Sequence, residues 1–417
     1  MSKGKIKVGV FGLNRGMTMV NVLLKHPDAE LVAVCDSLEP FRRKCKKVVD
    51  QTDAKVTYYD NFDNFFNHDM DAVVLANFAN EHTPYACKLL MSGRHVMSEV
   101  LPVATLAQAV ELVEAVEKSG KVYSYAENYS YFAATQEAKR LYKNGDLGEF
   151  MHGEGEYVHC ISKPAPELSY GDKTHWRNNS FSTFYCTHSL GPILTITGLR
   201  PVKVVGFETP VAPYRKGKSG TSGMEILQLS NGGTVKSLHG GLKREPWSPW
   251  YIIYGTKGMI ESCRGHESVD RVSLYLDDHD LTETELSYQP RRPMAELATK
   301  VGGKGHWGGD FYTTHYFLQK ILDRSGGEEI IDVYQALDMG VPGIMAFRSI
   351  LDGNVPKEVP DFRNKDIREK YRNDHWSTFP NVSPNHLLPR CSFPSPEVPD
   401  SHYEEIKKAW EKMASEF

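Results

Sequence analysis

IKVGVFGLNRG, residues 6–16, decides the fold, because it joins a β-rich run, Ile6–Phe11, to a helical pattern at Thr18–Lys25. A second β-rich run, Leu31–Cys35, ends at Asp36. In dinucleotide-binding sites this first turn holds the pyrophosphate against the N–H groups at a helix N-terminus. The acid at the end of the second strand binds the adenosine ribose. The stretch therefore predicts a cofactor site, and Asp36 favours NAD over NADP.

The glycine motif departs from the G-x-G-x-x-G pattern of such turns. Asn14 occupies a glycine position, and the turn is one residue shorter. A plain strand–helix turn would have a similar local sequence, so the motif alone discriminates little. The strand–helix rhythm and the acid at Asp36 favour cofactor binding over that alternative.

Short β-rich runs alternate with helical patterns from residue 6 to about 126. Such alternation favours parallel strands joined by right-handed crossovers, and hence a doubly wound sheet. Beyond it, strand follows strand, which predicts an α+β domain with a largely antiparallel sheet. Glycine-rich turns at 231–233 and 240–241 predict hairpins. We predict an α/β protein with an NAD-binding domain at 1–126, a second domain at 127–355 and a C-terminal extension at 356–417.

Length and composition agree with a two-domain globular enzyme. The 417 residues exceed what one core usually holds, and 49 Lys and Arg against 53 Asp and Glu give a net charge of −4. That balance gives no support to nucleic-acid or anionic-membrane binding. The seven cysteines form no C-x-x-C pair, which favours a reducing compartment. With no signal-like N-terminus and no apolar run near ~20 residues, we expect a cytoplasmic protein.

Two short motifs follow the predicted nucleotide turn: Ser98-Glu-Val-Leu-Pro102 and Phe184-Tyr-Cys-Thr-His188. With the N-terminal half they resemble the Gfo/Idh/MocA oxidoreductase family, over a stretch from Lys7 to about Phe362. The resemblance implies a Rossmann domain that binds NAD(P) and a C-terminal sheet domain over the nicotinamide. The family's Glu-Lys-Pro lysine is absent here, and Phe184 replaces an aspartate. Simple dehydrogenase chemistry is therefore disfavoured.

In these departures the chain is similar to glycoside hydrolase family 109. This family is a branch of NAD-dependent glycosidases with Glu-Val-Pro in place of Glu-Lys-Pro. The segment Gly305–Asp310 is similar to that branch's His-Gly-Gly-x-Asp helix start. Trp247 stands where the branch often has a tyrosine, so aglycone or sugar preference is expected to differ. Further matches to the branch's site positions are Glu127, Tyr157, His159, Tyr185 and His188.

The resemblance implies transient oxidation of a sugar at C3, elimination between C1 and C2, addition of water and re-reduction, with NAD recycled and no metal. His188 is expected to accept the proton of the oxidised hydroxyl with support from Tyr185, and Tyr157 and His159 to handle the C2 proton or leaving oxygen. The expected substrate-binding residues are Glu127, which binds sugar hydroxyls or orients a base, His306, Asp310 and Trp247. The expected cofactor-binding residues are Gly12, Asn14, Arg15, Gly16, Asp36, Asn77, His82, Glu99 and Val100. A homodimer or homotetramer is expected through the open face of the C-terminal sheet.

Two other functions stay open: an NAD-dependent sugar or inositol dehydrogenase, and a catalytically silent sugar or cofactor sensor. Plainer interpretations of single residues stay open too. Tyr157 and His159 share one strand face and could form only a polar patch. His306 and Asp310, four residues apart, could form only a cap or salt link. No HExxH or paired-cysteine spacing supports a metal.

Overall fold

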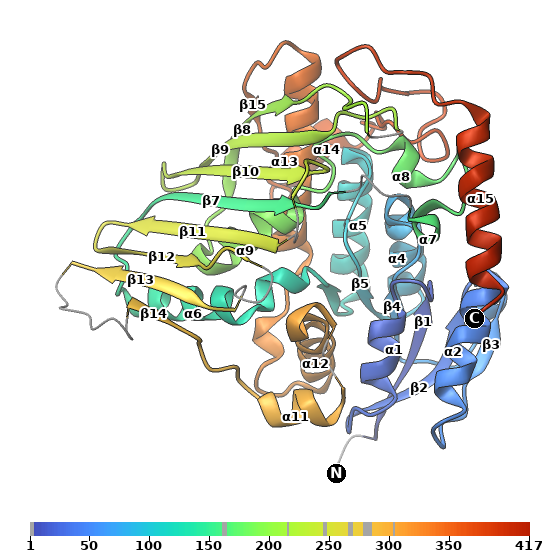
Figure 1. The fold of residues 1–417 in the computed structure, drawn as a ribbon. Helices are drawn as coiled ribbons and strands as arrows, with labels where there is room; N and C mark the ends of the chain where they lie inside the picture. Colours follow the sequence, from blue (N-terminus) through green and yellow to red (C-terminus); the bar gives the residue numbers. More distant parts are fainter. Residues whose placement is uncertain are drawn as a thin grey trace.

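The computed structural model describes residues 4–160, 165–214, 217–244, 248–265, 270–277, 286–302 and 305–417. Two sheets organise the chain, one of six strands and one of nine. Figure 1 shows the six-stranded sheet with its helices at the right and the nine-stranded sheet at the left. The predicted class, an α/β protein with a doubly wound first domain and a largely antiparallel second sheet, is confirmed.

The first sheet is parallel throughout, with the order β3-β2-β1-β4-β5-β6. Its strands are β1 (Ile6–Phe11), β2 (Ala29–Cys35), β3 (Thr57–Tyr59), β4 (Ala72–Leu75), β5 (His95–Ser98) and β6 (Tyr123–Tyr125). The helices of this domain are α1 (Met17–Leu23), α2 (Glu39–Val49), α3 (Phe62–Phe66), α4 (His82–Met91) and α5 (Leu106–Ser119). The sequence analysis did not predict β3 or α3.

The second sheet has the order β14-β13-β12-β11-β7-β10-β9-β8-β15. Its strands are β7 (Phe150–Val158), β8 (Pro201–Glu208), β9 (Ser222–Leu229), β10 (Thr234–Gly240), β11 (Ser248–Gly255), β12 (Gly258–Ser262), β13 (Val272–Leu276), β14 (Ser287–Tyr288) and β15 (Lys357–Glu358). The hairpin expected at 231–233 joins β9 to β10. The hairpin expected at 240–241 is wrong, because β7 lies between β10 and β11 and runs parallel to β10.

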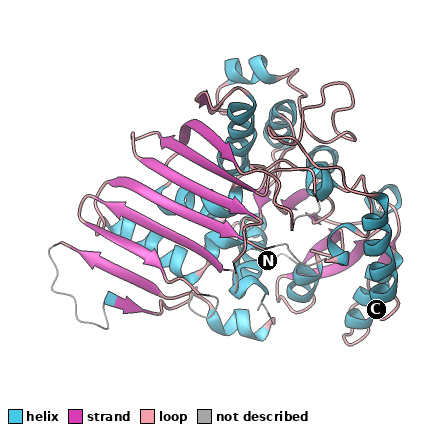
Figure 2. Ribbon diagram, turned by 45° about the horizontal axis from the view of Figure 1, so that its top comes forward, coloured by secondary structure: helices cyan, strands magenta, loops and turns pink. Residues whose placement is uncertain are grey.

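Helices cover one face of the nine-stranded sheet, as Figure 2 shows, and the opposite face carries no helix among the described residues. The covering helices are α6 (Ala133–Asn144), α9 (Thr187–Thr197) and α13 (Val333–Leu351). The remaining α-helices are α7 (Pro166–Ser169), α8 (Trp176–Asn179), α11 (Ala295–Lys300), α12 (Gly309–Leu322), α14 (Lys365–Tyr371) and α15 (Asp400–Ala414).

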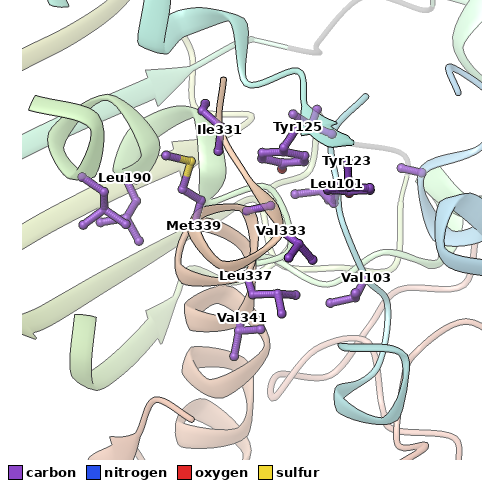
Figure 3. Close-up of a cluster of buried hydrophobic side chains, with 14 of the residues drawn as sticks. Leu101, Val103, Tyr123, Tyr125, Leu190, Ile331, Val333, Leu337, Met339 and Val341 are labelled. Atoms are coloured by element: carbon purple, nitrogen blue, oxygen red, sulfur yellow. The ribbon is translucent and has the colours of Figure 1, made fainter. Parts of the chain in front are cut away.

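Helix α13 forms the core between the two domains. In Figure 3 its apolar residues Leu337 and Met339 lie between Leu190 of α9 and the Leu101–Tyr125 side of the first domain. Among the described residues, the segment Gly327–Leu351 is the one long and apolar enough to cross a membrane by length and composition, and 78% of its most apolar window is buried inside the protein. That burial is typical of a core helix.

The last helices return to the first domain. Helix α12 contacts α1, and its Phe317 and Leu318 join the core that contains β1 and β2. Trp410 of α15 packs against Phe41 of α2, with ring centroids 5.2 Å apart. The end of the chain thus lies beside the domain that begins it, and α15 stands along its edge in Figure 1.

A glycine sets how closely α9 approaches the sheet. A Cβ at Gly155 of β7 would lie 1.8 Å from the Ser189 carbonyl oxygen of α9. We expect Gly155→Ala to destabilise the protein by about 1–3 kcal/mol, because either the strand or the helix must shift. Urea unfolding checks this, with Gly4→Ala as the control, since a Cβ there meets nothing within 4 Å. Equal midpoints for the two variants would contradict the prediction.

Candidate active site

A pocket of about 450 Å³ lies where the carboxyl ends of the first sheet's strands meet the second domain. This edge is where open α/β sheets bind their ligands. The pocket brings together nine of the residues predicted from the sequence: Arg15, Asn77, Glu99, Val100, Tyr157, His159, Tyr185, His188 and His306. They come from six separate stretches of the chain, so their convergence is a property of the fold.

A carboxylate–imidazole pair supports the pocket wall, with His188 lining the pocket and Glu127 buried behind it. His188, in the first turn of α9, places Nδ1 2.8 Å and 2.9 Å from the two carboxylate oxygens of Glu127, which follows β6. Glu127 is fully buried and also accepts a hydrogen bond from Thr187 Oγ1 at 2.8 Å. Because Nδ1 is held in this way, Nε2 is the nitrogen left for proton transfer.

Three tyrosines surround the His188 ring. Tyr129 stacks on it with centroids 4.3 Å apart, while Tyr157 and Tyr185 approach edge-on at 4.8 Å and 5.2 Å. Burial is the main cause that raises the pKa of Tyr157 and of Tyr185, so both phenols stay protonated at neutral pH. The tyrosines therefore offer hydroxyl donors beside an imidazole that accepts protons.

Arg15 ties the glycine turn to the second domain. Its Nη2 lies 2.7 Å from Glu99 Oε1 and 2.6 Å from Asp310 Oδ1. Asp310 also receives hydrogen bonds from Asn128 Nδ2 at 2.9 Å and pairs with His306 Nδ1 at 2.9 Å. Burial alone would raise the pKa of Asp310, but Arg15 and His306 hold it well below its ordinary value. The network is thus a charged clamp across the domain interface.

The glycine turn has the shape that a dinucleotide needs. Gly12 has φ +92°, and a Cβ there would lie 2.3 Å from the Ala76 carbonyl oxygen. Asp36 accepts the N–H of Leu13 at 2.7 Å and of Leu38 at 2.9 Å. Burial raises the pKa of Asp36, and those two N–H donors oppose the rise. The Asp36 carboxylate therefore holds the backbone of the glycine turn in place through the N–H of Leu13.

The residues present fit NAD. Both polar atoms of the Asn77 side chain are buried in the pocket wall without a hydrogen-bond partner among the described residues. An amide in that state matches the hydroxyl and carboxamide groups of a dinucleotide. A side chain at Gly12 or Gly16 would occupy the space at the glycine turn where the pyrophosphate would bind. A Cβ at Gly16 would lie 2.2 Å from the Gly12 carbonyl oxygen. Gly12, Gly16, Asp36, Asn77 and Val100 are the residues that would hold the cofactor.

Besides Arg15 and Glu99, several other predicted residues contact groups of the protein. Glu127 was expected to bind sugar hydroxyls or to orient a base, and its buried carboxylate holds His188, as in the second of these roles. Asp310 was expected to bind substrate or to form a salt link with His306, and its buried carboxylate pairs with Arg15 and His306. Asn14 was expected to bind cofactor; its Nδ2 instead donates to the Glu167 carbonyl at 2.9 Å. His82, also expected to bind cofactor, is buried with its ring nitrogens against the carbonyls of Leu101 and Asn77. Trp247 lies outside the described residues.

The pocket also contains Arg177, Asn128 and Tyr129, which were not predicted as site residues. The guanidinium of Arg177 lies 4.3 Å from the Trp176 ring centroid and 5.9 Å from that of Tyr185. Both Arg177 and Trp176 belong to the four-residue helix α8, which has too short a pattern to detect. Asn128 and Tyr129 directly follow Glu127, and that adjacency was the available signal.

Two family models match the chain. Residues 6–127 match the oxidoreductase family with an NAD-binding Rossmann fold, and residues 208–369 match the C-terminal domain of glycosyl hydrolase 109. The chain is 26% identical to a glycosyl hydrolase family 109 protein of Saccharopolyspora erythraea over 392 residues, covering 86% of this chain and 83% of that protein. It is 26% identical to glycosyl hydrolase family 109 protein 1 of Phocaeicola vulgatus, covering 86% and 84%.

A solved structure has the same fold. The WlbA dehydrogenase of Bordetella pertussis, crystallised with NADH and UDP-GlcNAcA, matches with a TM-score of 0.69 and 18% identity, covering 86% of this chain and 99% of that one. Its likeness shows the architecture, and the sequence matches show the relationship. By these matches the chain is an NAD-binding enzyme similar to glycosyl hydrolase family 109 proteins, with a Gfo/Idh/MocA-type Rossmann domain at residues 6–127 and a glycosyl hydrolase 109-type C-terminal domain at residues 208–369.

Proposed function

We propose that this enzyme hydrolyses glycosides by transient oxidation of the sugar, with NAD recycled within each turnover. The observation that carries the proposal is the Glu127–His188 pair, set among Tyr129, Tyr157 and Tyr185 beside the cofactor turn. The names of the family 109 relatives support the same reaction class. We further propose that the substrate is a small glycoside and that the enzyme acts in the cytoplasm.

The residues divide the proton transfers among themselves. The chemistry that NAD supplies when bound is reversible hydride transfer at one carbon of the sugar. Loss of hydride from C3 requires the C3 hydroxyl to lose its proton, and His188 Nε2 accepts it while Glu127 stabilises the imidazolium. A ketone at C3 acidifies the hydrogen at C2, and Tyr157 with His159 lies in the pocket wall to take it. The ion pairs of Arg15 with Glu99 and Asp310 hold the two domains in a fixed relative position during these steps.

A dehydrogenase that releases its oxidised product is the second candidate. The structural likeness to the WlbA dehydrogenase favours it at the level of the fold. The two reactions differ in their products, since the glycosidase forms no net NADH and releases an aglycone.

The deciding experiment is NMR of the purified protein with α- and β-glycosides in D₂O, without added cofactor. Release of aglycone with deuterium at sugar C2 is expected, because elimination exchanges that hydrogen with solvent. A keto sugar that forms only when NAD⁺ is added would overturn the proposal in favour of the dehydrogenase.

We also propose that the open face of the nine-stranded sheet joins copies of this chain into a dimer or tetramer. Large apolar side chains are exposed on that face at Phe207, Ile226, Tyr254 and Tyr275. A patch of this kind is typical of a contact surface. Light scattering is expected to give a multiple of the 47.0 kDa chain mass. Tyr254→Glu is then expected to lower the measured mass of the assembly. A monomeric mass for the unaltered protein would contradict the proposed assembly.

A further inference from the structure

A second buried acid–imidazole pair reaches the same pocket through its imidazole. Glu225 of β9 and His239 of β10 are 0% and 1% exposed, with Oε2 and Nδ1 3.5 Å apart. His239 lines the pocket. Ser189, the residue after His188, places Oγ 2.8 Å from Ser237 Oγ and 3.5 Å from His239 Nδ1. The two acid–imidazole pairs are therefore connected through the first turn of α9.

This pair has unused hydrogen-bonding capacity. Both carboxylate oxygens of Glu225, Nε2 of His239 and Oγ of Ser182 lack a well-formed hydrogen bond within the part of the chain that the structure describes, where only Ser237 lies near the Glu225 carboxyl and the Ser182 backbone near the His239 ring as weaker neighbours. Ser182, 8% exposed, lines the pocket next to His239. Buried polar atoms are rarely left unpaired, and leaving one so is unfavourable. Unpaired atoms on a pocket wall indicate a ligand that supplies the missing partner.

The surroundings decide where the proton of this pair resides. Burial raises the pKa of Glu225 to about 8 and lowers that of His239 to about 3. The titratable groups that face them, among the described residues, are the Cys186 thiol from α9 towards Glu225 and the His188 ring towards His239. At neutral pH the carboxyl thus keeps its proton and the imidazole is neutral. The pair holds one proton that it can give away.

We propose that His239 and Glu225 form the acid that protonates the glycosidic oxygen as the aglycone leaves. This inference rests on the proposed function and extends it. C1 and C3 of a sugar ring are not adjacent, so His188, which serves the C3 hydroxyl, does not also serve the oxygen on C1. His239 is another imidazole of the wall, and its Nε2 has no well-formed hydrogen bond among the described residues.

The proton transfer balances within the pair. The C1–O bond breaks as the C2 anion forms the C1–C2 double bond, and the oxygen takes the proton from His239 Nε2. The carboxyl proton of Glu225 passes to Nδ1, which leaves a neutral imidazole and a carboxylate. When water adds at C1, its proton returns through His239 to Glu225, and the pair regains its starting state. His239 touches the substrate, and Glu225 acts through it as a positioning residue.

The test compares glycosides whose aglycones differ in acidity. A nitrophenolate leaves without protonation, whereas a methoxide does not. We expect Glu225→Gln to slow release from methyl glycosides at least tenfold more than from p-nitrophenyl glycosides, and to leave deuterium exchange at C2 in place. Glu154→Gln on β7 is the matched control, since Glu154 pairs with Lys236 on the open face of the sheet. Equal slowing on both substrates would overturn the inference and show a structural role.

A measurement on the unaltered protein covers the case in which Glu225→Gln does not fold. Release from methyl glycosides is expected to fall as the pH rises through about 8, where Glu225 loses its proton, and release from p-nitrophenyl glycosides is not. Parallel pH profiles would refute the proposal. If the unaltered protein releases aglycone from neither series, the proposed hydrolysis itself fails, and the inference with it. The two failures are therefore distinguishable.

Discussion

Replacing His188 with alanine is expected to lower aglycone release by about 10²–10⁴-fold, the usual contribution of a positioned acid or base. The imidazole is held at Nδ1 by Glu127 at 2.8 Å, and alanine leaves the hydroxyl proton without an acceptor. NAD is expected to remain bound, because the glycine turn and Asp36 lie in the other domain. Single-turnover kinetics and the ultraviolet absorbance of bound NAD check both parts.

The control for this variant is His152→Ala. His152 also lies on an element that contacts α9, but its side chain is on the open face, where Nδ1 hydrogen-bonds Thr234 Oγ1. Its loss is expected to leave turnover unchanged. Full activity in the His188 variant would show that His188 takes no part in the reaction. Loss of NAD from it would show that the change acts through the fold instead.

Local sequence patterns were sufficient for the longer amphipathic helices of the fold. The stretches 106–119 and 133–144 form α5 and α6, and each is amphipathic and ends at a glycine with positive φ, which is a pattern visible in the sequence. Helix α9 was not predicted because Gly191 and Pro192 lie inside it. Packing between α13 and the sheet overrides their low helix propensity.

Sheet order was harder to predict than strand position. The Gly240–Gly241 pair ends β10 as expected, but β7, some eighty residues earlier, pairs beside it. A glycine turn specifies where a strand stops, and it does not specify which strand fills the next place. The wrong hairpin follows from that limit.

At the site, too, the sequence indicated which residue types take part but not where their side chains lie. Residue types were enough to select His188 and Glu127, yet only burial shows that Glu127 orients the imidazole and does not meet the substrate. His239 and Glu225 were missed because each lies on a strand whose alternation predicts only a half-buried position. Their proximity across β9 and β10 comes from pairing that the sequence pattern does not encode.

Replacing Gly12 with alanine is expected to abolish NAD binding, the second large effect. Gly12 has φ +92°, which is unfavourable for any residue with a Cβ, and the added carbon would lie 2.3 Å from the Ala76 carbonyl oxygen. The turn must move to relieve that contact, and moving it displaces the N–H groups that face the pyrophosphate. Activity is expected to vanish with the cofactor.

The control variant Gly93→Ala separates the loss of the NAD-binding turn from the effect of backbone strain. Gly93 has nearly the same φ, +89°, but a Cβ there would meet only Lys121 Cε at 3.9 Å, and it lies between α4 and β5, away from the glycine turn. Strain at positive φ destabilises both variants, and the contact with Ala76 destabilises the Gly12 variant further, so its thermal midpoint should fall more. Only the Gly12 variant should lose NAD in calorimetric titration. Retained NAD in that variant would mean that the turn does not hold the pyrophosphate, and the cofactor site would have to be sought elsewhere along the strand ends.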